Sequence, residues 1–227
     1  MKRLAILTPL VALATTLIPS SVVFAQPAGD EVLLQMQQAS RKQDIRALTT
    51  LLPAIQGHPL EVWGHYWALK ARLSSATAQE VEDFLQRWRG TYQEDRLRND
   101  WLLLLGQRRN WAEFERLHTE FRMQDDKQLR CYDLAIASIE GRLPQHASTE
   151  LQQLWMGQPA NDDGCTYAAS TLYAAEQLPA LAVWQRARLG AERNQLSTAR
   201  NALTIVAPQH VDALAGLFKS PQAYLSN

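Results

Sequence analysis

Hydrophobic residues recur along most of the chain with the spacing of an α-helix, and no segment alternates with a period of two. Positions i, i+3, i+4 and i+7 form one stripe along a helix, whereas a half-buried strand alternates. The pattern therefore predicts an all-α protein of about twelve short helices. The clearest stripes are Leu48–Ile55, Val62–Leu73, Val81–Trp88, Trp111–Phe121, Tyr132–Ile139, Leu151–Trp155, Ala199–Val206 and Val211–Phe218.

Several residues mark where these helices begin and end. Thr77 with Glu80 three residues later forms a capping box at the start of one helix. Pro53 is expected to kink or end the helix that contains it, because proline has no N–H and clashes with the preceding turn. Gly141 and Pro144 are expected to end the helix of Tyr132–Ile139.

The turns between paired helices recur at intervals of about 32 to 35 residues, near Ser75, Gln107, Arg142 and Gln177. A helix hairpin that repeats with this period is typical of an α-solenoid, in which each pair buries its apolar face against its neighbours. The alternative is an irregular helical bundle, which needs no period. We favour a tetratricopeptide-like superhelix, because the spacing persists across most of the chain.

The amino terminus has the pattern of a secretory signal peptide. Lys2 and Arg3 precede an apolar stretch at 4–18, and Val23-Phe24-Ala25 places small or medium residues before a cleavage site. The alternative is a membrane anchor, but about 15 apolar residues fall short of the ~20 that span a bilayer. The sequence predicts a signal peptide at 1–25, a helical domain at 26–227, export to the periplasm, and no membrane anchor after cleavage.

Composition and cysteine content narrow the function further. The 23 basic residues balance the 23 acidic ones, which argues against a nucleic-acid partner. Export makes one disulfide between Cys131 and Cys165 the favoured interpretation of the two cysteines. The alternative is a reactive thiol pair, but neither cysteine lies in a C-x-x-C motif or beside a histidine.

Motifs for cofactor chemistry and metal binding are absent from the sequence. It has no glycine-rich phosphate loop, no G-x-S-x-G and no H-E-x-x-H, so we expect no cofactor. His58, Glu61 and His65 have a spacing that would allow metal ligation on one helix face. Pro59 places His58 before the helix, however, so no metal site is expected.

Three further clusters have a structural and a functional interpretation. The doublets Asp125-Asp126 and Asp162-Asp163 could be paired catalytic carboxylates, but each precedes a helix and is expected to cap it. The aromatic cluster of Trp63, His65, Tyr66 and Trp67 could stack on sugars, but its helical spacing favours core packing. A solvated surface is expected for the remaining cluster, Arg87, Trp88, Arg89, Arg96 and Arg98.

Most of the mature chain, roughly residues 40 to 220, resembles the amino-terminal superhelical region of the soluble lytic murein transglycosylases. The shared features are a leucine and proline run followed by aromatics, a W-L-x-x-L-G run that leads to W-x-x-F, and the order of the two cysteines. The residues that carry the resemblance are Leu48–Leu52, Pro53, His58–Trp63, Tyr66, Phe84, Leu85, Trp88, Leu97–Leu102, Leu105, Gly106, Arg108–Trp111, Phe114, Cys131, Tyr132, Gly141, Leu154, Trp155 and Cys165.

The resemblance implies a periplasmic protein of peptidoglycan turnover whose partner is the glycan strand. Members of the family cleave between N-acetylmuramic acid and N-acetylglucosamine without water, using one glutamic acid in a carboxyl-terminal lysozyme-like domain. That domain carries a Glu-Ser pair, a G-L-M-Q stretch and an A-Y-N-A-G stretch, and none of them occurs here. No catalytic, glycan-binding or metal-binding residue is therefore assigned, and the helical region is expected to be incomplete at its carboxyl end.

Two functions of different class follow. In the first, the chain is the superhelical part of a lytic transglycosylase and binds or positions glycan for a catalytic domain. In the second, it is a stand-alone periplasmic helical-repeat adapter that binds a protein partner.

Overall fold

The computed structural model describes residues 29–226, and this part of the chain is helical throughout, without a strand. The all-α prediction is therefore confirmed, whereas the predicted signal peptide at 1–25 lies outside the described residues. The α-helices are α1 Asp30–Arg41, α2 Ile45–Leu51, α3 Glu61–Ala71, α4 Ala78–Arg87, α5 Tyr92–Gln107, α6 Trp111–His118, α7 Lys127–Ile139, α8 Ala147–Met156, α9 Asp163–Ala174, α10 Ala180–Glu192, α11 Leu196–Val206, α12 Val211–Lys219 and α13 Pro221–Leu225. Short 3₁₀ helices are η1 Leu52–Ile55, η2 Leu73–Ser75 and η3 Pro208–His210.

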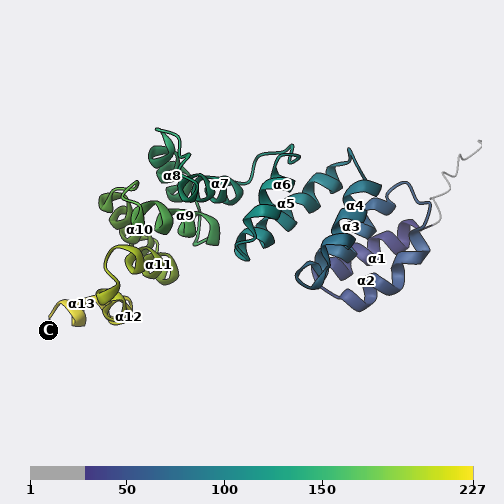
Figure 1. Cartoon of the computed structure of the whole chain (residues 1–227). Coiled ribbons are helices and arrows are strands. Elements are labelled where there is room, and N and C mark those ends of the chain that lie inside the picture. The colour runs from purple at the N-terminus through teal and green to yellow at the C-terminus, as the bar shows by residue number, and fades with distance from the viewer. Residues whose placement is uncertain (1–28, 227) are drawn as a thin grey trace, which may run out of the picture.

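The helices follow one another in chain order along an elongated molecule, from α1–α4 at one end to α12 and α13 at the other (Figure 1). Each odd-numbered helix packs against the next odd-numbered helix: α1 on α3, α3 on α5, α5 on α7, α7 on α9 and α9 on α11. Among residues 29–226, no helix combines the length and apolar character that a membrane span requires.

The apolar side chains form three core clusters in line rather than one central core. The first joins α1, α2 and α3 around Met36, Leu48 and Ile55. The second extends from α3 to α7, and the third from α7 to α11. Helix α7 contributes to both of the larger clusters: Tyr132 faces the second, whereas Leu134 faces the third.

Most of the predicted helix boundaries are confirmed. The capping box of Thr77 and Glu80 is formed in both directions at the start of α4. Helix α2 ends at Leu51, and Pro53 lies in the 3₁₀ turn that follows. Helix α7 ends at Ile139, and Gly141 takes a left-handed backbone with φ of 71°. Such a conformation suits glycine, because it has no Cβ to clash.

One predicted stripe, Trp111–Phe121, extends beyond its helix. Helix α6 ends at His118, so Phe121 lies in the connection to α7. Its side chain is nevertheless buried in the second core cluster. Phe121 therefore belongs to the core as the pattern indicates, but it reaches the core from a turn and not from the helix.

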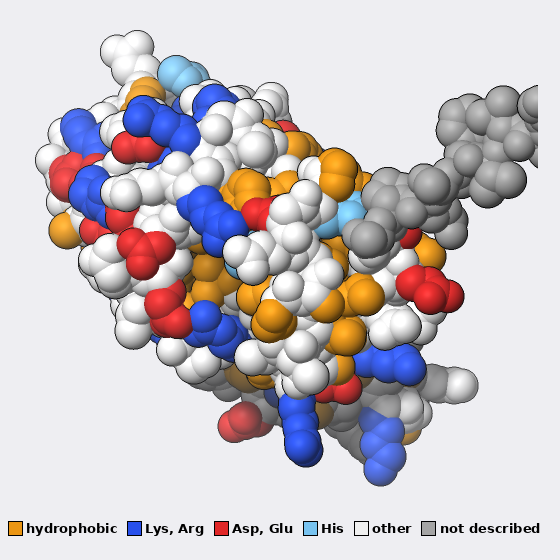
Figure 2. Space-filling view, turned by 90° about the vertical axis from the view of Figure 1, so that its right-hand side faces the viewer, with side chains coloured by type: hydrophobic (Ala, Val, Ile, Leu, Met, Phe, Trp, Pro, Cys, Tyr) orange, Lys and Arg blue, Asp and Glu red, His pale blue; other side chains and the backbone are white. Residues whose placement is uncertain are grey.

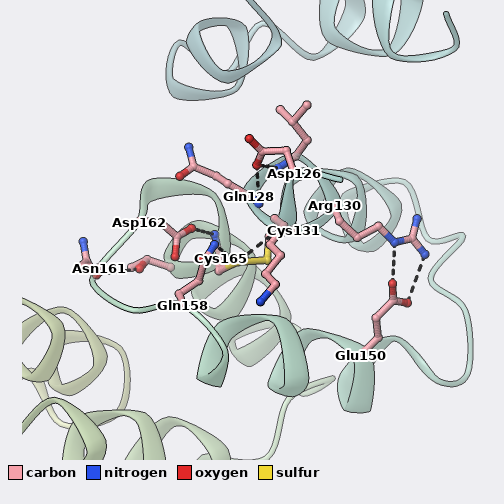
Figure 3. The surroundings of a disulfide bond; sticks show 12 residues. Asp126, Gln128, Arg130, Cys131, Glu150, Gln158, Asn161, Asp162 and Cys165 are labelled. Carbon is pink, nitrogen blue, oxygen red and sulfur yellow. Dashed lines mark hydrogen bonds and ion pairs between the residues drawn. A yellow bond between two sulfur atoms is a disulfide. The ribbon is translucent and has the colours of Figure 1, made fainter. Parts of the chain in front are cut away.

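The predicted disulfide is confirmed and joins α7 to α9. Cys131 and Cys165 are fully buried, with an S–S distance of 2.02 Å and Cα atoms 4.8 Å apart. Figure 3 shows the bond between the two helices, with the Arg130–Glu150 ion pair connecting α7 to α8 beside it. Gly164 permits this close approach, because a Cβ there would lie 2.6 Å from the carbonyl oxygen of Gln128.

Candidate functional site

A polar groove of about 410 Å³ lies between α9, α11 and the turn that connects α5 to α6. We call it the polar groove. Most of its lining side chains carry hydroxyl, amide or carboxylate groups, and a single aromatic ring stands among them. The lining residues are Arg109, Asn161, Asp162, Asp163, Thr166, Tyr167, Ser170, Asn201, Thr204 and Ile205.

Arg109 forms one wall of the polar groove from the α5–α6 turn, where it takes a left-handed φ of 57°. Its guanidinium binds Asp163 with two hydrogen bonds, Nη1 to Oδ2 at 2.5 Å and Nη2 to Oδ1 at 3.0 Å. The same guanidinium lies 3.9 Å from the centre of the Tyr167 ring. This bidentate, stacked geometry is specific to arginine and fixes both partners in place.

Tyr132 completes the same cluster from α7. Its hydroxyl donates to Asp163 Oδ2 at 2.5 Å, and its ring fills the space above Gly106, where a Cβ would come within 2.3 Å of ring carbon. Burial, and then the hydrogen bond to Asp163, raise the pKa of Tyr132 above its ordinary value. The hydroxyl therefore stays protonated and acts as a donor.

The Asp163 carboxylate is held in its charged form. Partial burial alone would raise its pKa, but the hydrogen bonds from Arg109 and Tyr132 outweigh burial and lower the pKa below the ordinary range. Because the charge of Arg109 is neutralised by Asp163, this wall offers no free cation to an anionic ligand.

Three lining side chains of the polar groove keep their polar groups free. The hydroxyls of Tyr167 and Ser170 and the amide of Asn201 make no hydrogen bond to another described residue. Each is uncharged and can both donate and accept. The groove therefore offers a ligand neutral hydrogen-bonding groups next to an immobilised aromatic ring.

Asp163→Asn is expected to destabilise the protein most at neutral pH. A carboxyl whose folded pKa is lowered stabilises the folded state above its unfolded pKa, about 3.9, and the contribution is lost as the pH falls through the folded pKa. The difference in unfolding free energy between wild type and variant should therefore shrink below about pH 4. Urea titrations at several pH values measure it. Asp212→Asn, at an exposed position without an ion pair among the described residues, should show no such trend. A pH-independent Asp163→Asn effect would contradict the assignment.

The four aromatic residues predicted as a sugar platform or as core do not form one surface. Tyr66 is buried in the second core cluster and donates to Asp100 Oδ2 at 2.8 Å. His65 packs against Trp88 instead. Trp63 contacts the Tyr66 ring edge-on, with ring centres 6.0 Å apart, and lies beside Trp67, with ring centres 5.6 Å apart. Trp63 and Trp67 line a second groove, between α1 and α3.

The residues considered for metal binding have separate partners. His58 lies 2.8 Å from Asp30, and Glu61 binds Arg87 at 2.8 Å. Within residues 29–226, no three His, Cys, Asp or Glu side chains meet in a way that could hold a metal ion.

In each acidic doublet, one of the two aspartates caps a helix, as predicted. Asp126 accepts from the backbone N–H groups of Gln128 and Leu129 at the start of α7, and Asp162 accepts from that of Cys165 at the start of α9. Asp163, by contrast, is the charged centre of the polar groove.

The prediction of a solvated arginine surface is wrong for Arg98. This side chain is only 4% exposed and binds Glu94, fully buried on the previous turn, at 2.5 Å. Asp95, also buried, lies 3.8 Å from it and accepts hydrogen bonds from the backbone of Arg122 and Met123. The charges therefore anchor the connection between α6 and α7 to α5.

Comparison of the chain with protein-family models, with curated proteins and with solved structures gives no match. The resemblance of the sequence to the lytic transglycosylases therefore stays a prediction, and the candidate function depends on the chemistry of the polar groove.

Proposed function

We propose that the helices form a tetratricopeptide-like α-solenoid. Residues that are 34 positions apart meet repeatedly, which supports this arrangement because equivalent positions of neighbouring repeats lie side by side in a solenoid. The packing of every second helix on the next gives the same support. The contacts with this separation are Tyr66 with Asp100, Arg108 with the carbonyl of Ser74, Arg116 with Glu82, and Cys131 with Cys165.

We further propose that this solenoid binds the glycan strands of peptidoglycan through the polar groove, in the periplasm, and positions them for a catalytic domain. The free hydroxyl and amide groups of Tyr167, Ser170 and Asn201 carry this proposal, because sugar hydroxyls and N-acetyl groups are uncharged donors and acceptors. Peptidoglycan as the source of the sugar is proposed from the resemblance of the sequence. The signal-peptide pattern and the buried disulfide support export.

Binding, and not bond cleavage, suits the two carboxylates of the polar groove. Asp162 Oδ1 caps α9, while its Oδ2 is buried and has no hydrogen-bond partner. Asp163 is held by Arg109 and Tyr132. Neither carboxylate has a free oxygen at the surface for proton transfer to a sugar.

Co-sedimentation with purified sacculi tests the proposed function. Ser170→Ala together with Asn201→Ala should weaken binding by about tenfold, since each change removes a hydrogen bond worth about 0.5–1.5 kcal/mol. The matched control is Ser197→Ala with Gln38→Ala, at exposed positions outside the polar groove, which should leave binding unchanged. No anhydro-muropeptides should be released. Equal sedimentation of both double variants would contradict glycan binding in this groove.

A further inference from the structure

A second groove, of about 450 Å³, runs between α1 and α3 at the amino-terminal end of the described chain. We call it the α1–α3 groove. Leu33, Leu34, Leu60, Trp63 and Trp67 make its floor and walls apolar. Figure 2 faces this end of the molecule and shows hydrophobic side chains gathered there, bordered by both basic and acidic side chains.

Two apolar side chains of this groove are open to solvent to an unusual degree. Leu34 is 59% exposed and Leu60 is 48% exposed. The surface continues past Trp63 to Tyr92, whose ring centre lies 6.1 Å from that of Trp63 and whose side chain is 56% exposed. Contiguous exposed apolar surface of this kind marks a contact with another molecule.

The basic residues beside the groove have no acidic partner in the described chain. Arg41 lines the groove, Lys42 follows it, and Arg46 lies on the first turn of α2, all without an ion pair among residues 29–226. Most arginines between α3 and α8, by contrast, pair with a carboxylate: Arg72, Arg87, Arg98, Arg109, Arg116, Arg122, Arg130 and Arg142. The acidic residues of α1, Asp30 and Glu31, lie at its opposite end.

We propose that the α1–α3 groove binds an amphipathic helix of a partner protein, with acidic residues at the end that meets Arg41, Lys42 and Arg46. The apolar stripe of the helix would lie along α1 and α3 and cover Leu34, Trp63 and Trp67. Helix α1 has 12 residues and is about 18 Å long, so it matches about three turns of a bound helix.

The shape of the site favours a helix over a lipid surface. The apolar side chains line the groove between two neighbouring helices, and a third helix commonly packs into such a groove. A membrane instead contacts side chains that protrude from a convex face. The cations stand at one end of the groove, which suits a ligand whose charge is also at one end.

A synthetic peptide tests this proposal independently of glycan. The probe is an 18-residue helix of Leu, Ala and Gln with leucines at i, i+3, i+4 and i+7 and three glutamates at one end. Fluorescence titration of the full chain should show saturable binding. Leu34→Asp should abolish it, and Arg41→Glu with Lys42→Glu should weaken it by at least about tenfold, because like charges then face each other.

Matched controls distinguish specific binding in the α1–α3 groove from nonspecific binding to the protein surface. Arg89→Glu, at an exposed arginine that also lacks an ion pair, should leave peptide binding unchanged. The same peptide with lysine in place of glutamate should bind at least about tenfold more weakly. Equal binding of the two peptides would overturn the proposal. The absence of peptide binding would also overturn it. This holds even if phosphatidylglycerol vesicles bind wild type but fail to bind Leu34→Asp, because the groove would then bind lipid instead of a helix. A failure to bind sacculi would contradict the proposed function of the polar groove and would leave the α1–α3 proposal unaffected.

Discussion

Arg98→Met should lower the free energy of unfolding by about 3–5 kcal/mol, the range seen when one partner of a buried ion pair is removed. The substitution keeps most of the side-chain volume but removes Arg98, the nearer cation of the fully buried Glu94, at 2.5 Å. Arg122 still binds Glu94 at 2.7 Å, so the loss should fall toward the lower end of this range. Asp95 would also lose Arg98 as a neighbour. Urea denaturation followed by circular dichroism measures the loss.

The control for this effect is Arg116, a surface arginine that also binds more than one carboxylate. Arg116 is half exposed and binds Glu113 at 2.7 Å and Glu82 at 3.1 Å. Arg116→Met should cost less than about 1 kcal/mol, because solvent already screens these charges. Glu94→Gln in the Arg98→Met background should recover part of the loss. A cost for Arg98→Met no larger than for Arg116→Met would contradict the role of burial.

Removal of the disulfide should have a similar effect. Cys131→Ala with Cys165→Ala opens a loop of 34 residues and should lower the free energy of unfolding by about 3–4 kcal/mol, less any strain released. The loss arises mainly because the unfolded chain gains conformational freedom. Urea midpoints of wild type, measured with and without reductant, provide the comparison.

The state of the thiols can be checked separately by mass spectrometry. Alkylation of the denatured protein without reductant should add no mass, whereas alkylation after reduction should add two adducts. Two adducts without reductant, or a urea midpoint that reductant does not move, would show that the bond does not form or does not stabilise the protein.

The sequence predicts the helix boundaries well, because their causes are local. Thr77 caps α4 with its own hydroxyl, and Pro53 interrupts α2 through its missing N–H. The disulfide is also predictable, since a chain with two cysteines has a single possible intramolecular pairing. Phe121 shows where this reasoning fails: an apolar stripe gives the side chains that are buried, but the backbone can leave the helix before the stripe ends.

The candidate site could not be predicted, because it is made by contacts between distant residues. Arg109 and Asp163 are 54 positions apart, and nothing in either local sequence distinguishes them from a surface arginine and a helix cap. Arg98 and Glu94 have the i, i+4 spacing of an ordinary exposed pair on a helix. Only the packing of the connection after α6 over α5 makes that pair a buried one.

The position of α7 between the two larger core clusters has a consequence for cooperativity. Tyr132 on one face and Leu134 on the other are both almost fully buried, so neither cluster can open along this helix without exposing part of the other. Helices at the carboxyl end differ: α12 packs on α11 but has no buried residue, so it can fray at lower cost to the rest. The two halves of this elongated molecule are therefore energetically coupled through this helix of 13 residues, and the Arg109–Asp163 pair joins them beside it.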